Sequence, residues 1–481
     1  MMLAGINLTP ALPELFLLCA ASLLLIVDLL LGDERQNLSN ALSLLALLGT
    51  GWLVWHNQPG DAAQYTFNRM FVLDGMAWVT KLAAVITVAL VMVFGRVYAE
   101  DRGFFKSEYR ILMLFALFGL FVLISANNLL AMYVGLEVMS LATYALVALE
   151  RDSVRSTEAA MKYFVLGALA SGMLLYGMSM VYGGTRTLFV EDIAAMLSSG
   201  AANAILVKIG LVFMVAGLAF KLGAVPFHMW VPDVYHGSPT AVTLFVSSAP
   251  KLAAFVFLTR TLVIALPALH VDWQMMLTVL AVASIAIGNL TAIAQTNLKR
   301  MLAYSAISHM GFVILGVMTN TQDGVAASMF YVVTYMLMTL GGFGLILLLA
   351  RSGFEAENLS DLKGLAKRSP LFGGVLLLVM FSMAGIPSTV GFISKFSVLS
   401  AVLASGQTWL TVTVVLLSVI GAFYYLRIVK LAYFDAPESS EGFTRCPSQR
   451  VLLVLTALAI LALGVMPQWL LDLCSRNIHL G

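Results

Sequence analysis

Long apolar runs occupy most of the chain, and short polar or charged stretches separate them. A helix needs about 20 mostly apolar residues to cross the hydrocarbon core of a bilayer. Fourteen stretches reach this length, at about 11–31, 38–57, 74–96, 110–126, 128–149, 155–183, 203–234, 239–266, 273–296, 300–319, 324–350, 370–404, 408–434 and 450–474. The pattern predicts an all-α, polytopic membrane protein with about 14 transmembrane helices, which are numbered here as spans one to fourteen.

Two of these spans are long for a single crossing and contain helix breakers near their middle. The seventh span (203–234) contains Pro226, and the twelfth span (370–404) contains Pro387. Proline removes a backbone donor and clashes with the preceding turn, so both helices are expected to break. Because backbone groups freed inside lipid must be satisfied by protein or water, we expect a hydrated cavity beside each break.

The two breaks lie five spans apart, which indicates an internal repeat. If spans four to eight (110–266) and spans nine to thirteen (273–434) are two units, the break falls in the fourth helix of each. Because five is an odd number, the second unit enters the membrane from the opposite side, as in inverted-topology transporters with sites near the bilayer midplane. The expected organisation is an N-terminal three-helix segment (1–109), two inverted five-helix repeats and a C-terminal helix (435–481).

Composition agrees with a membrane protein and excludes several classes. Of the 481 residues, 60% are hydrophobic and 11% are charged, whereas soluble domains have about 25% charged residues. A soluble enzyme and a nucleic-acid-binding protein are therefore excluded. The cysteines, Cys19, Cys446 and Cys474, form no CxxC pair, and no Walker, Rossmann or HExxH motif occurs. We expect the chain itself to bind no cofactor and no metal.

Basic residues gather on one side of the predicted membrane. On the side of both termini, the loops hold Arg69, Arg186 and Arg476. The loops of the opposite side hold many more, for example Lys299 and Arg300. The positive-inside rule makes the crowded side cytoplasmic and places both termini outside.

Some basic residues lie inside the spans, where a charge at the bilayer centre costs about 2.5–3.5 kcal/mol. They are Lys81, Lys162, Lys208, Lys221, Lys251, Arg260 and Lys395. Lys81, Lys208 and Arg260 lie near external span ends, so their side chains are expected to reach the interface. Lys162 follows Glu158 by four residues, and a local ion pair would account for it. The other lysines are too deep for either explanation.

Glu137 is the only acidic residue near the middle of a span. At helical spacing it shares a face with Tyr133, Ser140 and Tyr144. Lys221, just before the break of the seventh span, is its natural partner. The two groups form either a fixed structural ion pair or a switchable one, in which moving the carboxylate away releases the lysine proton.

Further polar residues mark the interiors of other spans. Lys251 follows Ser247 by four residues, and that hydroxyl can hold water. Lys395 follows the break of the twelfth span. His309, in the tenth span, is suited to relaying protons, although a hydrogen-bonded packing histidine is the alternative. The secondary candidates for proton transfer are Lys162, Glu158, Tyr144 and His228, the last of which either connects to the cytoplasmic side or only packs.

Two segments resemble the antiporter-like subunits of respiratory complex I and of Mrp-type cation/proton antiporters. They are Asn297-Leu-Lys-Arg-Met-Leu-Ala-Tyr-Ser-Ala-Ile-Ser-His309 and Lys221-Leu-Gly-Ala-Val-Pro-Phe-His-Met-Trp-Val-Pro-Asp-Val-Tyr. Within this family the chain looks like the N-type subunits, because it stops after span fourteen, carries Lys395 where M-type subunits have glutamate, and reads Met161-Lys162-Tyr-Phe-Val-Leu-Gly-Ala in its sixth span.

The resemblance implies a proton-translocating membrane subunit of NADH:quinone oxidoreductase and a role for each matching residue. Glu137 and Lys221 would form a switching pair, and Lys251 would be the central relay. His309 would lead to the second unit, and Lys395 would deliver protons to the external side.

The resemblance also implies neighbours and a location. M and K subunits and membrane lipid would surround the chain in a bacterial plasma membrane, and other subunits would hold FMN and iron–sulfur clusters and react with NADH and quinone. An Mrp-type sodium/proton antiporter subunit is the alternative, and a scaffold whose buried charges fix helix register is a third reading. Sodium prefers oxygen ligands, whereas these candidates are lysines and a histidine with one carboxylate, which favours protons.

Overall fold

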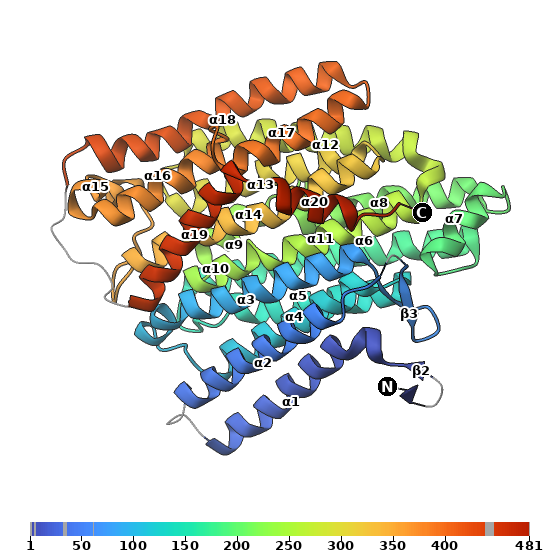
Figure 1. The fold of residues 1–481 in the computed structure, drawn as a ribbon, viewed down its shortest axis with the longest axis horizontal. Helices are drawn as coiled ribbons and strands as arrows, with labels where there is room; N and C mark the ends of the chain where they lie inside the picture. Colours follow the sequence, from blue (N-terminus) through green and yellow to red (C-terminus); the bar gives the residue numbers. More distant parts are fainter. Residues whose placement is uncertain (1, 4–5, 32–35, 61, 438–446, 481) are drawn as a thin grey trace.

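Long helices lie side by side through most of the chain in the computed structural model (Figure 1). The structure describes residues 1–481 except 1, 4–5, 32–35, 61, 438–446 and 481, so Cys446 lies outside the described residues. Among those described, thirteen helices are long and apolar enough to cross a membrane, and the twelfth predicted span adds two shorter apolar helices. All fourteen predicted spans are therefore present, and the prediction of an all-α membrane protein is confirmed.

Most spans form one helix each. The first six are α1 (Leu12–Leu31), α2 (Gln36–His56), α3 (Gly75–Asp101), α4 (Ser107–Ser125), α5 (Leu129–Val147) and α6 (Val154–Thr185). Later single helices are α12 (His270–Ala294), α13 (Leu298–Met318), α14 (Gln322–Leu349), α18 (Thr408–Phe434) and α19 (Pro447–Val465). Side-chain caps fix where several of them begin: Asn128 and Asn297 accept hydrogen bonds from the backbone nitrogens of Leu130 and Arg300, as residues at helix N-caps do.

The two expected breaks are confirmed. The seventh span forms α8 (Ala204–Leu222) and α9 (Trp230–Gly237), and the twelfth forms α16 (Pro370–Ala384) and α17 (Val390–Ala404). Both first halves end in the same way, because Gly223 and Gly385 follow them with φ angles of 76° and 87°. Glycine adopts this left-handed conformation without a steric penalty.

The eighth span is also interrupted, which we did not predict, although Pro250 lies at the interruption. It forms α10 (Thr240–Val246), α11 (Ala249–Leu258) and a π-helical turn η3 (Thr259–Ile264). Between α10 and α11, the hydroxyl groups of Ser247 and Ser248 both donate to the carbonyl oxygen of Leu244. Such local bonds compete with the regular helical pattern.

Shorter elements connect the spans. The helical ones are η1 (Thr9–Ala11), α7 (Val190–Ser198), η4 (Pro267–Leu269), η5 (Leu359–Leu362), α15 (Leu365–Arg368) and α20 (Gln468–Arg476), and two small hairpins pair β1 (Met2–Leu3) with β2 (Ile6–Asn7) and β3 (Gln64–Thr66) with β4 (Phe71–Leu73). The expectation that span fourteen reaches residue 474 is wrong, because α19 ends at Val465. After Pro467 the chain turns into α20, which packs against α14.

The helices that carry Lys251 and His309 are the most deeply buried of the long spans. The eighth span and α13 are almost wholly covered by other helices, whereas α18 and α19 are mostly exposed. Small residues allow close approach elsewhere: Gly177 of α6 and Gly210 of α8 face each other's carbonyl oxygens, with no room for a side chain, as in many membrane helix pairs. Segments α7 and β3 lie at one end of the helices and α15 at the opposite end (Figure 1).

Candidate functional site

Lys221 is in the last turn of α8, and Glu137 is in the middle of α5. The Nζ atom of Lys221 donates a hydrogen bond to Oγ of Ser140 over 2.9 Å. Ser140 lies one turn after Glu137, whose Oε1 atom is buried without a hydrogen-bond partner among the described residues. No ion pair within 4.0 Å joins Glu137 and Lys221 in this part of the chain. The predicted pair is therefore open here, and Ser140 holds the amino group.

Lys251, in the first turn of α11, reaches across to the broken end of α8. Its Nζ atom donates to the carbonyl oxygens of Lys221 and Leu222, over 3.2 and 2.9 Å. The indole nitrogen of Trp230 donates to the adjacent carbonyl of Phe220 over 3.0 Å. These bonds satisfy the carbonyls that a helix end leaves without partners. They also place the amino group of Lys251, whose side chain is only 1% exposed, beside the break.

Lys395, on α17, makes the equivalent contact in the second half of the chain. Its Nζ atom donates to the carbonyl oxygens of Met383 and Ala384 over 3.0 and 2.9 Å, at the end of α16. The negative end of a helix dipole stabilises a cation there. The amino group also lies 5.6 Å from the centre of the Phe312 ring. Lys251 and Lys395 therefore have matching surroundings, although they lie on different helices of their proposed units.

His309, on α13, lies between two tyrosine hydroxyls. Nδ1 is 2.8 Å from the hydroxyl of Tyr331, and Nε2 is 3.1 Å from the hydroxyl of Tyr425. Tyr425 continues to Oγ of Ser305 over 2.5 Å. Phe312 stacks on Tyr331 and also contacts Lys395. Because each ring nitrogen has a hydroxyl partner that can donate or accept, His309 is part of a continuous hydrogen-bonded chain.

The secondary candidates have more local roles. Lys162 forms the expected ion pair with Glu158 over 2.7 Å and a second one with Asp233 over 2.9 Å. His228 lies in the segment between α8 and α9, and its buried Nδ1 atom has no hydrogen-bond partner among the described residues. The ring of Tyr144 lies 6.0 Å from the Nζ atom of Lys221. Lys162 is a half-exposed ion-pair residue, whereas Tyr144 belongs to the surroundings of Lys221.

Two residues expected to reach the interface are buried instead. Lys81 is 1% exposed and forms an ion pair with Glu14 of α1. Arg260 is 3% exposed and pairs with Asp74 over 2.9 Å. The expectation is wrong for both because each cation has an acidic partner far away in the sequence. Lys208 alone behaves as expected, since it is half-exposed and pairs with Asp272.

The amino groups of the central arrangement are placed so that they can exchange protons. Among the described residues, Lys251 and Lys395 contact carbonyl dipoles and not carboxylates, so no contact ion pair there fixes either amino group in its charged form. An amine held in this way can exist as the ammonium or as the free base. Within the described chain, no group of three or more His, Cys, Asp or Glu side chains could hold a metal ion.

Sequence comparisons show to which family the chain belongs. The family model described as "NADH:quinone oxidoreductase/Mrp antiporter, TM" matches residues 126–421, which include all five central candidates. The chain is 56% identical to the NADH-quinone oxidoreductase subunit N of Laribacter hongkongensis, over 99% of this chain and 98% of the relative. The chain belongs to the NADH-quinone oxidoreductase subunit N family. The corresponding protein of Thiobacillus denitrificans is 54% identical over 99% of both chains.

Solved structures show the same fold. A chain of respiratory complex I from Thermus thermophilus with bound aureothin superposes with a TM-score of 0.84 at 30% identity, over 97% of this chain and 100% of that one. The Mrp complex from Dietzia sp. contains a chain with a TM-score of 0.79 at 22% identity, covering 98% and 96%, which is a likeness of fold alone. As a member of the subunit N family, the chain is a multi-pass membrane subunit of NADH-quinone oxidoreductase.

Sequence reasoning missed several polar residues of this subunit. Tyr331 and Tyr425 were not singled out, because a tyrosine in an apolar helix usually only packs. Asp233 and Lys299 were also missed, since both lie at span ends where charged side chains commonly reach solvent. Lys299 is nevertheless 2% exposed. For Asp233 the local signal was its place in the motif that follows Lys221.

Proposed function

We propose that this subunit transfers protons across the membrane through a series of buried basic side chains, driven by the redox chemistry of NADH-quinone oxidoreductase. The main support is the common placement of Lys251 and Lys395. Each amino group lies in the interior of the bundle, at the broken end of a helix, and bonds to two backbone carbonyls. Ionisable groups placed inside a membrane mark proton and ion pathways.

In this proposal, the residues act in the order in which they neighbour one another. Glu137 and Lys221 switch first: when the carboxylate approaches, the ammonium of Lys221 is stabilised, and when it withdraws, the proton moves on. Lys251 is the next acceptor, because it bonds to the backbone oxygen of Lys221. His309, with its two tyrosine partners, continues the pathway, and Lys395 releases protons to the external side.

We further propose that residues 110–266 and 273–434 are inverted repeats, preceded by a three-helix segment (1–109) and followed by the C-terminal part (435–481). The two left-handed glycines after α8 and α16, and the lysine bound to each helix end, support this relation. Both repeats also have the break in the fourth helix.

The partners that we propose are M and K subunits and membrane lipid. Glu137 is partly exposed on one face of α5. The same face carries three exposed apolar side chains, Leu130, Val134 and Leu141. A carboxylate on such a face would be costly against lipid, so another subunit is expected to cover it. FMN, the iron–sulfur clusters and the sites for NADH and quinone are assigned to other subunits of the complex.

The proposed location is a bacterial plasma membrane with both termini outside. The support is the distribution of basic residues, most of which lie in the loops on one side of the predicted membrane. Helix α15 lies at that end of the helices (Figure 1). The positive-inside rule makes that end cytoplasmic.

Proton pumping by the assembled complex in vesicles tests the proposal. Glu137→Ala or Lys221→Ala should abolish the proton pumping that this subunit contributes. Lys208→Ala removes a half-exposed lysine of α8, the helix of Lys221, and should leave pumping unchanged. Normal pumping by both central variants would overturn the proposal. Sodium transport by the chain alone would instead favour an antiporter.

A further inference from the structure

The segment between α8 and α9 is bonded to a helix of the other proposed repeat. The backbone nitrogens of Gly223 and Ala224 donate to carbonyl oxygens of α8, over 3.0 and 2.8 Å, and so complete the last turn of that helix. The backbone nitrogen of Val225 instead donates to Oγ of Ser284 over 2.9 Å. Ser284 lies on α12, the ninth span, and its side chain is fully buried. A hydroxyl of the second proposed repeat therefore holds the break of the seventh span.

The hydroxyl of Ser284 is oriented by its own helix. It donates to the carbonyl oxygen of Leu280 over 2.6 Å, and its oxygen still has a lone pair with which to accept from Val225. Val225 is 6% exposed, and a buried backbone N–H group needs an acceptor. The next residue, Pro226, has no N–H group to offer. The bond to Ser284 is thus the one that ties this part of the break to α12.

Helix α12 is in turn packed tightly against α13. A side chain at Gly288, one turn after Ser284, would place its Cβ atom 2.8 Å from the carbonyl oxygen of Tyr304 on α13. A side chain at Gly311 of α13 would place its Cβ atom 2.9 Å from the carbonyl oxygen of Ala281 on α12. Neither position has room for a side chain, so the two backbones are in direct contact, as in other closely packed membrane helices. The position of Ser284 therefore depends on α13.

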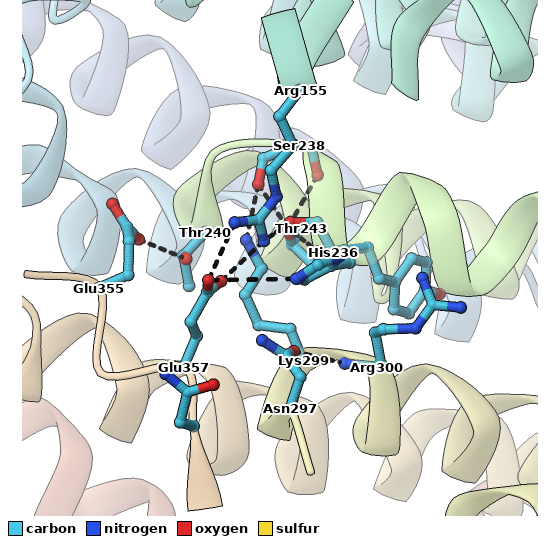
Figure 2. Close-up of polar contacts among 12 residues, drawn as sticks. Arg155, His236, Ser238, Thr240, Thr243, Asn297, Lys299, Arg300, Glu355 and Glu357 are labelled. Atoms are coloured by element: carbon cyan, nitrogen blue, oxygen red, sulfur yellow. Dashed lines mark hydrogen bonds and ion pairs between the residues drawn. The ribbon is translucent and has the colours of Figure 1, made fainter. Parts of the chain in front are cut away.

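The opposite end of α9 is bound to α13 as well. The Nζ atom of Lys299, in the first turn of α13, donates to the carbonyl oxygen of Ser238 over 2.7 Å (Figure 2). Arg300 of α13 pairs with Asp233 of α9 over 2.9 Å. Lys162 of α6 pairs with the same carboxylate. Helix α9 therefore bridges the two proposed repeats, with the α12–α13 pair bonded to the chain both before and after it.

We propose that Ser284 is a positioning residue, through which the α12–α13 pair fixes the place where the end of α8 meets Lys251. The two carbonyl oxygens that bind Lys251 belong to residues three and four positions before Val225. A displacement of Val225 therefore reaches them through a short backbone segment. Because α13 also carries His309, a movement of that helix in one repeat is transmitted to the lysines of the other. The inference rests on the proposed function and adds to it the contact that couples the two repeats.

Ser284→Ala tests the positioning role in the assembled complex. The Val225 nitrogen loses its acceptor, so hydrogen–deuterium exchange of residues 223–229 should rise by roughly 2- to 12-fold, the equivalent of one hydrogen bond. The NH₃⁺ infrared band that disappears in Lys251→Arg should shift, and the proton-to-electron ratio in vesicles should fall. Thr278→Val is the control and should change none of the three, because it removes a hydroxyl of α12 that donates to the carbonyl oxygen of Gln274.

The possible results of this experiment separate the inference from the proposed function. Exchange and a lysine band that both match those of Thr278→Val would overturn the inference. Faster exchange with an unchanged band and an unchanged ratio would show that the bond is only structural, which also overturns it. If Lys251→Met pumps normally, the proposed function fails, whereas the exchange and the band still report whether Ser284 holds the break.

Gly288→Ala tests the contribution of α13 without removing the hydroxyl. The added methyl group forces α12 away from α13, so the exchange of residues 223–229 should rise as it does in Ser284→Ala. A Cβ atom added at Gly172 of α6 meets no neighbouring element among the described residues within 4 Å, so Gly172→Ala is the control. Equal exchange in the two glycine variants would contradict the coupling of the repeats through α13.

Discussion

Lys251 and Lys395 make the same pair of bonds at the two helix breaks of this subunit. Each amino group donates to the last two carbonyl oxygens of the helix before the break, Lys251 on α8 and Lys395 on α16. The two lysines do not occupy equivalent sequence positions, since Lys251 lies in the span after its break and Lys395 in the second half of its own broken span. The chemical surroundings are matched although the positions are not.

This relationship predicts that a positive charge at position 251 is not sufficient for proton pumping. Lys251→Arg keeps a cation that can bond to the carbonyls of Lys221 and Leu222, but arginine does not readily deprotonate. We expect the complex to assemble and the proton-to-electron ratio in vesicles to fall. Lys208→Arg is the control and should leave the ratio unchanged, because Lys208 pairs with Asp272 at the surface. An unchanged ratio for Lys251→Arg would show that the residue is only structural.

Two adjacent tyrosines of α18, Tyr424 and Tyr425, should be unequal in effect. Tyr425→Phe leaves Nε2 of His309 and Oγ of Ser305 without their shared partner. An unsatisfied buried group costs about 1–3 kcal/mol, so proton transfer should slow by roughly 5- to 150-fold. Tyr424→Phe is the control, since its hydroxyl bonds to Asn289 and not to the histidine. Equal pumping rates for the two variants would remove Tyr425 from the pathway.

The buried pair between Lys81 and Glu14 should affect stability but not pumping. Lys81→Met leaves the Glu14 carboxylate buried without its partner, which destabilises proteins by about 3–5 kcal/mol. The melting temperature of the Lys81→Met variant should fall. The double variant, Lys81→Met with Glu14→Gln, should regain most of the lost melting temperature. Whatever complex assembles should pump at the normal ratio. A lower ratio in the double variant would mean that the pair takes part in proton transfer.

The loop residue Glu357 should contribute stability that depends on pH. Burial alone would raise its pKa, but hydrogen bonds from Arg155 and the nearby charge of Lys299 lower the pKa below its ordinary value of 4.5. A lowered carboxyl pKa stabilises the folded state above pH 4.5, and this contribution is lost as the pH falls through the lowered value. Glu357→Gln should therefore lower the melting temperature at pH 7, and the difference should shrink below pH 4.5.

Glu100→Gln provides the control for this measurement. Glu100 pairs with Arg96 one turn away on the exposed surface of α3, and such pairs contribute little to stability. Its melting temperature should match that of the unchanged complex across the same pH range. The melting temperatures of the Glu357 variant and the unchanged complex could instead differ by a constant amount down to pH 3. That result would contradict the lowered pKa of Glu357.

Much of the fold could be predicted because membrane spans have a strong local signal. Apolar runs located all fourteen spans, and Pro226 and Pro387 located both breaks. The interruption between α10 and α11 has a similar marker, Pro250 in the first turn of α11, which we did not read as a break. The end of α19 was misjudged because the apolar residues after Pro467 read as a continuation of the helix and not as the separate α20.

The site was predicted less completely because its partners are distant in the sequence. The pairing of Lys81 with Glu14 and of Arg260 with Asp74 depends on how helices pack, which no local pattern reveals. The bond between Lys221 and Ser140 was missed for the opposite reason. Opposite charges made Glu137 the obvious partner, although Ser140 lies on the same face of α5.

Infrared difference spectroscopy of the complex with ¹⁵N-labelled lysine is the most direct test of the account. We predict that NH₃⁺ bending bands change during turnover with NADH and quinone, and that Lys251→Arg and Lys395→Arg each remove part of this signal. A spectrum in which both lysines stay charged throughout turnover, with no band sensitive to either substitution, would contradict proton transfer through these side chains.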